Sequence, residues 1–343
     1  MDVQNRWAAT TLLTESQSDP NPKPRSTGLA IFGTLQIGMG GLCALLVPLM
    51  VFSILVGPQA GSVPASQMLP AIGIYSLLAI GLVTLGIGSI LARRWARALT
   101  LVLAWMWLVM GIISMVSMLF VMPNIMAAGT PAPSPTALSF IYGVMIAMTV
   151  GIYIILPGIF ILFYRRSDVK ATCELCDPKV RWTDKCPLPV LSLSLMLAFG
   201  TSSVLWGAPC GYVMPFFGIF IKGIPGAILM VCLSVLFGYL AWAIYKMKIS
   251  AWWITLAVLL LAGLSAVITF VFHDVIDLYR EMNFPQDQLD IMEKSGAFGM
   301  NFPLLMAINT VAFIGYLLWV RRYFLIPPDS QMVNSQVSSA VGE

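Results

Sequence analysis

Long apolar runs separated by short polar turns dominate the chain. Eight runs of about 19–28 residues are each long enough to cross a bilayer, for which roughly 20 residues suffice. In lipid only helices and closed barrels satisfy every backbone group, and continuous runs of this length indicate helices. The predicted spans are Leu29–Val56, Leu69–Leu91, Ala98–Val121, Ala137–Tyr164, Leu188–Trp206, Pro225–Tyr245, Ala251–Phe272 and Phe302–Leu325.

The composition supports the same class of protein. Apolar residues make up 59% of the chain and charged residues 10%, whereas soluble domains average roughly 45–50% and 25%. No Asp or Glu lies between Pro20 and Ser167, so surface helices of a soluble fold would lack their charged faces. We therefore predict an all-α, polytopic integral membrane protein with about eight transmembrane helices, embedded in the lipid bilayer.

The basic residues predict how the chain is oriented. Of the 19 Lys and Arg residues, 16 lie on one side of the predicted spans, and only Lys222, Arg280 and Lys294 lie on the other. The positive-inside rule then places both termini and the central loop in the cytoplasm, and the protein in the cell (inner) membrane. The net charge of +4 does not indicate a nucleic-acid partner, because the basic residues sit at membrane edges.

Shifts in composition divide the chain into five parts. We predict a disordered cytoplasmic tail at 1–28 that leads into an uncleaved first span, and another disordered tail at 326–343. Between the tails lie a four-helix unit at 29–164, a cytoplasmic cysteine-containing linker at 165–187, and a second four-helix unit at 188–325. Gly and Pro within 207–226 indicate an interfacial or re-entrant stretch before the sixth span.

The two units resemble tandem copies. Segments with similar residues recur at nearly constant offsets, and four spans per unit would give both copies one orientation, with their symmetry axis along the membrane normal. The matching segments are Phe163–Arg166 with Trp319–Arg322, offset by 156 residues; Ala92–Ala96 with Met247–Ala251, offset by 155; and Leu46–Pro48 with Gly207–Pro209, offset by 161.

Small residues in the first two spans predict close helix packing. Helices in lipid associate through van der Waals contact, which small residues permit by letting backbones approach. Two pairs have small-xxx-small spacing, Gly40/Ala44 and Thr84/Gly88, and Gly38, Gly41 and Gly86 lie beside them. Ordinary packing within the chain, a dimerisation face and a thin-walled pathway are all compatible with this pattern.

The linker contains a candidate zinc site. Cys173, Cys176 and Cys186 supply three thiolates, and the C-x2-C spacing of the first two suits a tetrahedral zinc ion. No fourth Cys or His lies in the linker, so Asp177, Asp184 or a second protomer would complete the shell. The alternative is three free thiols, because a disulfide is not expected in the reducing cytoplasm.

The second candidate site is an acidic segment at 273–301 on the predicted outer side. Apolar residues at helical spacing in its first part indicate an amphipathic helix on the membrane surface. His273, Asp274, Asp277 and Glu281 could bind a cation or a protein partner there, and a solvated acidic face is the alternative.

Two weaker candidates lie at the ends of spans. Lys222 is expected to extend its ammonium group to the membrane surface. Met118, Met122 and Met126 share a helix face and could bind copper(I), although methionine is also an ordinary filler of apolar gaps.

The residues that are absent narrow the function. The chain has one histidine, no glycine-rich phosphate loop and no hydrolase motif, and the interiors of the predicted spans contain no Asp, Glu or Arg, since Arg321 and Arg322 lie at the end of the last span. An enzyme is therefore not expected. Two interpretations remain: a non-catalytic membrane scaffold, sensor or accessory subunit that contacts a membrane or cytoplasmic protein partner, and a permease for a neutral or apolar small solute that is not ion-coupled.

Overall fold

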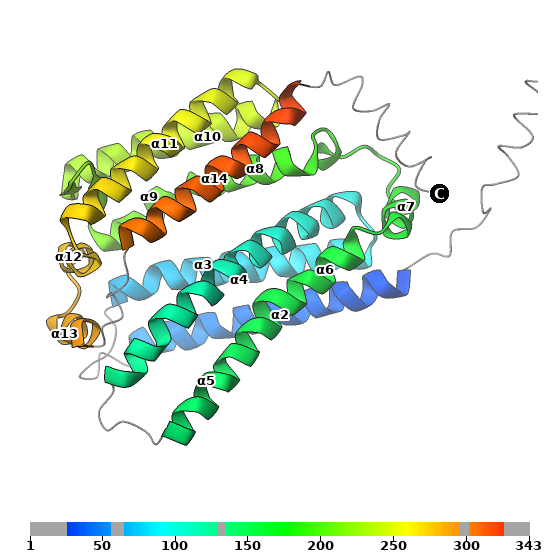
Figure 1. The fold of residues 1–343 in the computed structure, drawn as a ribbon. Helices are drawn as coiled ribbons and strands as arrows, with labels where there is room; N and C mark the ends of the chain where they lie inside the picture. The colour runs from blue at the N-terminus through cyan, green and yellow to red at the C-terminus, as the bar shows by residue number, and fades with distance from the viewer. Residues whose placement is uncertain (1–25, 56–64, 129–134, 295–301, 326–343) are drawn as a thin grey trace, which may run out of the picture.

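A computed structural model of the chain describes residues 26–55, 65–128, 135–294 and 302–325. Within these ranges the fold is all-α apart from one short hairpin, and eight helical segments are long and apolar enough to cross a membrane. The prediction of a polytopic helical membrane protein is confirmed. Figure 1 shows two groups of helices, with the helices before the linker in one group and those after it in the other.

The first unit contains four spanning segments. Its fourth segment is continuous but irregular, because a π-helical turn joins α5 to α6. The turn ends just before Pro157, which has no backbone N–H to donate to a helical carbonyl. The elements are α2 (Ser26–Leu55), α3 (Ala65–Ile90), α4 (Arg94–Ala128), α5 (Pro135–Val150), the π turn η1 (Gly151–Ile155) and α6 (Leu156–Tyr164).

The second unit also contains four spanning segments, of which the first is broken. The predicted span Leu188–Trp206 forms two helices, because the hydroxyls of Thr201 and Ser202 bond to the carbonyls of Ala198 and Phe199 where the helix stops. The elements are α8 (Leu188–Gly200), α9 (Ser203–Gly207), α10 (Gly223–Tyr245), α11 (Ile249–Phe272) and α14 (Phe302–Leu325).

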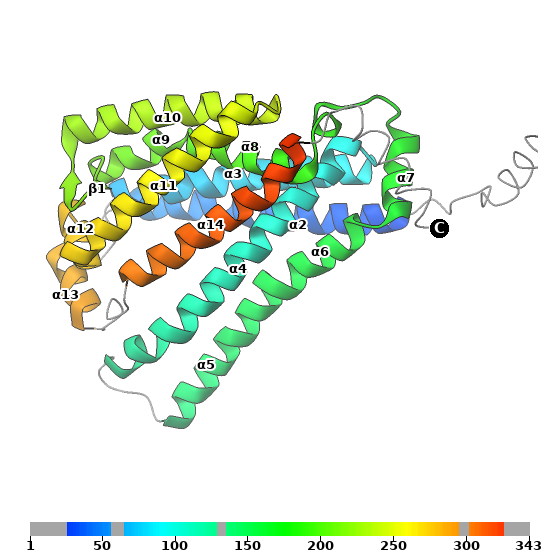
Figure 2. The same ribbon diagram turned by 45° about the horizontal axis from the view of Figure 1, so that its top comes forward.

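The linker, the start of α2 and the end of α14 lie at one end of the molecule, which we call the linker end (Figures 1 and 2). The linker itself is ordered and contains helix α7 (Ser167–Cys176) and the 3-10 turn η2 (Trp182–Asp184), neither of which the sequence predicted.

The opposite end, which we call the hairpin end, carries the stretch predicted to be interfacial or re-entrant. After α9 the chain forms the 3-10 turn η3 (Ala208–Cys210) and an antiparallel hairpin of β1 (Met214–Phe216) and β2 (Ile219–Ile221), with Met214 paired to Ile221. The acidic segment forms two helices, α12 (Val275–Glu281) and α13 (Gln286–Lys294), of which α12 lies next to β1 (Figure 2). Its remainder, 295–301, lies outside the described residues.

Three apolar clusters hold the described helices together. The first unit has a core around Leu29, Phe160 and Tyr164, and the second unit has a core around Leu240, Trp252 and Leu317. A smaller cluster of Val102, Cys186 and Leu191 joins the units. The indole of Trp252 donates to the Leu317 carbonyl at 2.9 Å, which satisfies its N–H inside the core.

Helices α2 and α3 pack along their lengths with their backbones in close contact. A Cβ atom on Gly33 would lie 2.6 Å from the Gly86 carbonyl oxygen, and one on Gly86 would lie equally close to the Gly33 carbonyl oxygen. Gly40 and Gly88 are also at contacts within the chain, as predicted for packing, whereas Ala44 is exposed and Gly38 and Gly41 have open space beside them. The Thr84 hydroxyl donates a hydrogen bond to the Ile80 carbonyl of its own helix.

Contacts in the second unit recur at the offsets seen in the sequence. The α3–α4 turn has amide hydrogen bonds from Leu91, Ala92 and Arg93 to the carbonyls of Ile87, Ser89 and Gly88. The α10–α11 turn has the same three bonds 155 residues later, from Lys246, Met247 and Lys248 to Trp242, Ile244 and Ala243. Ala92 and Met247, at the same offset, both have positive φ, of 49° and 57°.

Candidate functional site

A buried polar network lies inside the first unit, and each of its four spanning segments contributes one side chain to it. Tyr164 of α6 donates its hydroxyl to Ser89 of α3 at 2.8 Å, and Ser89 donates to the amide oxygen of Gln36 at 3.3 Å. The amide nitrogen of Gln36, on α2, donates to the Thr100 hydroxyl of α4 at 3.1 Å. All four side chains are buried, with 2% exposure or less.

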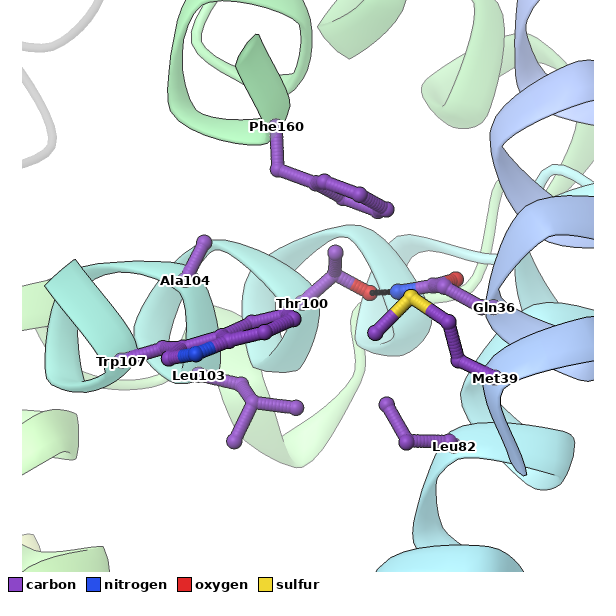
Figure 3. A pocket seen from close by; sticks show the side chains of 8 residues that line it. All are labelled: Gln36, Met39, Leu82, Thr100, Leu103, Ala104, Trp107 and Phe160. Atoms are coloured by element: carbon purple, nitrogen blue, oxygen red, sulfur yellow. Dashed lines mark hydrogen bonds between the residues drawn. The ribbon is translucent and has the colours of Figure 1, made fainter. Parts of the chain in front are cut away.

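This network satisfies its own members. Buried polar groups in lipid need partners inside the protein, and the Gln36 amide uses both of its ends within the network. A small cavity of about 10 Å³ adjoins Gln36 and Thr100 (Figure 3), which is at most about the room that one water molecule needs. Its other lining residues are Met39, Leu82, Leu103, Ala104, Trp107 and Phe160. The arrangement can fix how four helices pack, and it has no space for a substrate.

A second polar cluster attaches the linker to the first unit. The carboxylate of Asp177, which follows α7 and is 2% exposed, accepts bonds from Arg181 at 2.8 and 2.9 Å and lies 3.9 Å from Arg93. The hydrogen bonds from Arg181 lower the pKa of Asp177, and the carboxylate in turn raises the pKa of Arg181. Asp177 therefore stays ionised and holds the end of α7 against the α3–α4 turn.

The three linker cysteines occupy different surroundings. Cys173 is buried in the core of the first unit, Cys186 is buried in the cluster that joins the units, and Cys176 is exposed. Burial in apolar surroundings raises the pKa of both Cys173 and Cys186 to about 11, which disfavours the thiolates that zinc requires.

The described part of the chain brings no three His, Cys, Asp or Glu side chains together in a group that could hold a metal ion. Of the predicted additional ligands, Asp177 is engaged by Arg181, and Asp184 accepts the backbone N–H of Arg181 at 3.0 Å. The zinc site stays a prediction that this arrangement does not support.

Three of the four residues predicted for the acidic site meet where α12 begins. Asp274 caps the helix, and its backbone N–H donates to the Asp277 carboxylate at 3.1 Å. Asp277 also accepts a bond from Arg280 at 2.8 Å, and His273 Nδ1 lies 4.0 Å from its other oxygen. The same carboxylates that could bind a cation thus cap a helix and pair with an arginine.

The fourth residue, Glu281, faces the hairpin. It forms an ion pair with Lys222, which was expected only to reach the membrane surface. His273 Nε2 lies 3.1 Å from the Gly218 carbonyl, and the hydroxyls of Ser265 and Thr269 accept the N–H groups of Phe217 and Gly218. These contacts fix the hairpin to α11 and α12.

The predicted copper site lies on α4, but the side chains of Met118, Met122 and Met126 are outside the described residues. The polar network was missed by the sequence analysis, although Gln36 carries a signal: it is an amide in the middle of an apolar run. Ser89, Thr100 and Tyr164 carry no such signal, because single hydroxyls are common in membrane helices.

Comparison with known proteins does not identify the chain. No protein-family model, no curated protein and no solved structure matches it.

Proposed function

We propose that this chain is a non-catalytic membrane scaffold, sensor or accessory subunit that contacts a protein partner through its linker. Both termini and the linker end face the cytoplasm in this proposal, and α12 and α13 face the opposite side. The packing of the helices and the surface of the linker support it.

The observation that carries the proposal is the closed interior of the first unit. Where a thin-walled route could run, α2 and α3 are in backbone contact at Gly33 and Gly86, and the adjoining cavity holds at most about one water molecule. The buried hydroxyls of the described spans have hydrogen-bond partners within the protein, as Ser194 has in the Ala241 carbonyl and Ser89 in the Gln36 amide. No observation among the described residues favours a permease.

The orientation is supported by the distribution of charge. The described basic residues other than Lys222, Arg280 and Lys294 all belong to the linker or to turns and helix ends at the linker end (Figure 1). A biased distribution of this kind is typical of cytoplasmic surfaces.

The recurring contacts support tandem copies with one orientation. Besides the two matching turns, the close approach of Gly33 to Gly86 has a counterpart in the hydrogen bond from Ser194 to the Ala241 carbonyl. Gly33 and Ser194 are 161 residues apart, and Gly86 and Ala241 are 155 residues apart. The same two offsets relate the matching sequence segments. A duplicated unit suits a scaffold, because it presents the same helix ends twice.

The linker offers a surface for a partner. Leu175 and Val180 are 70% and 69% exposed on the linker, whose Asp177 pairs with Arg181 and lies near Arg93 of the first unit. Exposed apolar side chains on an ordered surface outside the lipid are typical of protein interfaces.

Native mass spectrometry of the full chain, purified in mild detergent from its own membrane, tests the proposal. We expect a stoichiometric second protein that the double variant L175D/V180D loses and the control K170Q, at another exposed position of α7, retains. A chain that carries no partner, or a partner that L175D/V180D retains, would contradict the proposal.

A further inference from the structure

A groove opens on the side of the second unit, near the linker end. It is a shallow, open depression between α8 and α10 beside η2, with a volume of about 330 Å³. Its lining residues are Trp182, Ser194, Ala198, Ala241, Trp242 and Tyr245.

The groove has aromatic walls and a closed floor. Trp182 and Trp242 are 45% and 50% exposed, and Tyr245 donates its hydroxyl to the Trp182 carbonyl at 2.9 Å. On the floor, the Ser194 hydroxyl donates to the Ala241 carbonyl at 2.8 Å. The rest of the floor is then a surface of methyl and methylene groups. Such walls and floor suit an alkyl chain and offer little to a polar solute.

The mouth of the groove is basic. Lys246 follows Tyr245 directly, and the ammonium group of Lys248 lies 4.5 Å from the centre of the Trp242 ring. The segment from Gly223 to Phe272, which contains α10 and α11, has no Asp or Glu. On η2, the carboxylate of Asp184 accepts the backbone N–H of Arg181 at 3.0 Å. An anionic group beside Trp242 would therefore meet the ammonium group of Lys248, with exposed Lys246 two residues away in the chain and no carboxylate on the same helices.

We propose that this groove binds an anionic phospholipid, with one acyl chain between Trp182 and Trp242 and the phosphate at Lys246 and Lys248. Trp, Tyr and Lys together mark the level of the headgroups, where the groove opens sideways toward the bilayer. Basic pockets between spanning helices on the cytoplasmic side are suited to acidic headgroups. The inference rests on the membrane-spanning fold and on the proposed cytoplasmic orientation of the linker end, and not on the proposed partner protein.

The test is native mass spectrometry of the delipidated full chain titrated with dioleoyl-phosphatidylglycerol or dioleoyl-phosphatidylcholine. We expect one tightly retained phosphatidylglycerol and weaker retention of phosphatidylcholine. Each lysine should contribute about fivefold, so K246Q/K248Q should weaken phosphatidylglycerol binding roughly thirtyfold. The matched control R322Q removes a cation that stacks on Trp319 away from the groove, and it should change nothing.

A second variant tests the acyl-chain part independently of charge. Ala198 is exposed, so A198W should fill the groove without disturbing the core and should abolish retention of both lipids. Thermal midpoints of each variant verify that it is folded. Unchanged phosphatidylglycerol binding in K246Q/K248Q or in A198W would overturn the proposal. Binding of inorganic phosphate alone would overturn it as well, and so would a dimer that A198W dissociates, since that would assign the groove to a second copy.

Discussion

In the repeat that we propose, helices α2 and α3 of the first unit correspond to α8 and α10 of the second, but the two pairs are held together differently. Gly33 and Gly86 let α2 and α3 touch backbone to backbone, whereas Ser194 places a hydroxyl between α8 and the Ala241 carbonyl. The first pair is closed, and the second leaves a groove beside the contact. The difference teaches that one arrangement of helices can be stabilised either by close packing or by a hydrogen bond, with different surfaces as the result.

The interiors of the two units also differ in how their helices are held together. Gln36, Thr100 and Tyr164 form the polar network of the first unit with Ser89. At the corresponding offsets the second unit has Leu197, Thr255 and Val320, and the Thr255 hydroxyl bonds only to its own helix at Ala251. The first unit therefore specifies its packing with interhelical hydrogen bonds and the second with apolar contact.

The largest expected effect concerns the thiols beside the closed unit. Because the pKa of Cys173 and of Cys186 is raised to about 11 by burial, their thiolate fraction at pH 8 is roughly a hundredfold below that of an ordinary thiol. Alkylation followed by peptide mass spectrometry should modify exposed Cys176 at least about a hundredfold faster. Equal rates would contradict the closed packing, and faster reaction after chelation would indicate a bound metal.

The same burial makes stability depend on pH. The neutral thiols are favoured in the folded state, so their contribution is complete below the unfolded pKa of about 9. It is lost as the pH rises toward about 11, the folded value for both thiols. We expect the thermal midpoint to fall over this range, and the fall to be smaller in C173A/C186A.

Next in size is the effect of a methyl group between α2 and α3. G33A would place its Cβ 2.6 Å from the Gly86 carbonyl oxygen, and overpacking of this kind destabilises by about 1–3 kcal/mol. Thermal unfolding in a fixed detergent should show a lower midpoint. The control G38A, which has nothing within 4 Å of its Cβ, should match the wild type. If the two variants behave alike, α2 and α3 are not in backbone contact.

Removing the amide from the polar network should have an intermediate effect. Q36L makes the first unit resemble the second at this position and removes two interhelical hydrogen bonds, a loss of about 1 kcal/mol. T34V serves as the control, since the Thr34 hydroxyl bonds only to Ala30 of its own helix. Stability equal to that of T34V would show that the network does not couple the helices.

The smallest effect is expected at the counterpart of Gly33. S194A removes one hydrogen bond to a carbonyl that already belongs to a helix, so the loss should be about 0.6 kcal/mol. The same thermal assay should rank G33A as more destabilising than S194A. The reverse order would contradict the comparison of the two helix pairs.

The sequence predicted the spans well because apolar length is what a bilayer requires, and eight runs correspond to eight helical segments. It did not predict the break between α8 and α9, since Thr201 and Ser202 act through local hydrogen bonds that composition does not reveal. The hairpin was also missed, because its turn at Phe217 and Gly218 is held by the hydroxyls of Ser265 and Thr269, about 50 residues away.

The candidate sites show the same limit. Spacing suggested that Cys173 and Cys186 could act together, but burial in two separate clusters is a property of the fold. The four members of the polar network are brought together by helix packing, and only Gln36 stands out in the sequence. Glu281 and Lys222 pair across 59 residues, which no local pattern could indicate.

The central claim is that the described helices of the first unit enclose no route for a solute. It is tested most directly by stopped-flow light scattering of proteoliposomes that contain the full chain, challenged with glycerol or urea gradients. We predict that volume recovery is as slow as in protein-free liposomes, and that G33A does not accelerate it. Recovery that is faster than in protein-free liposomes and proportional to the amount of incorporated protein would contradict the account and support a permease.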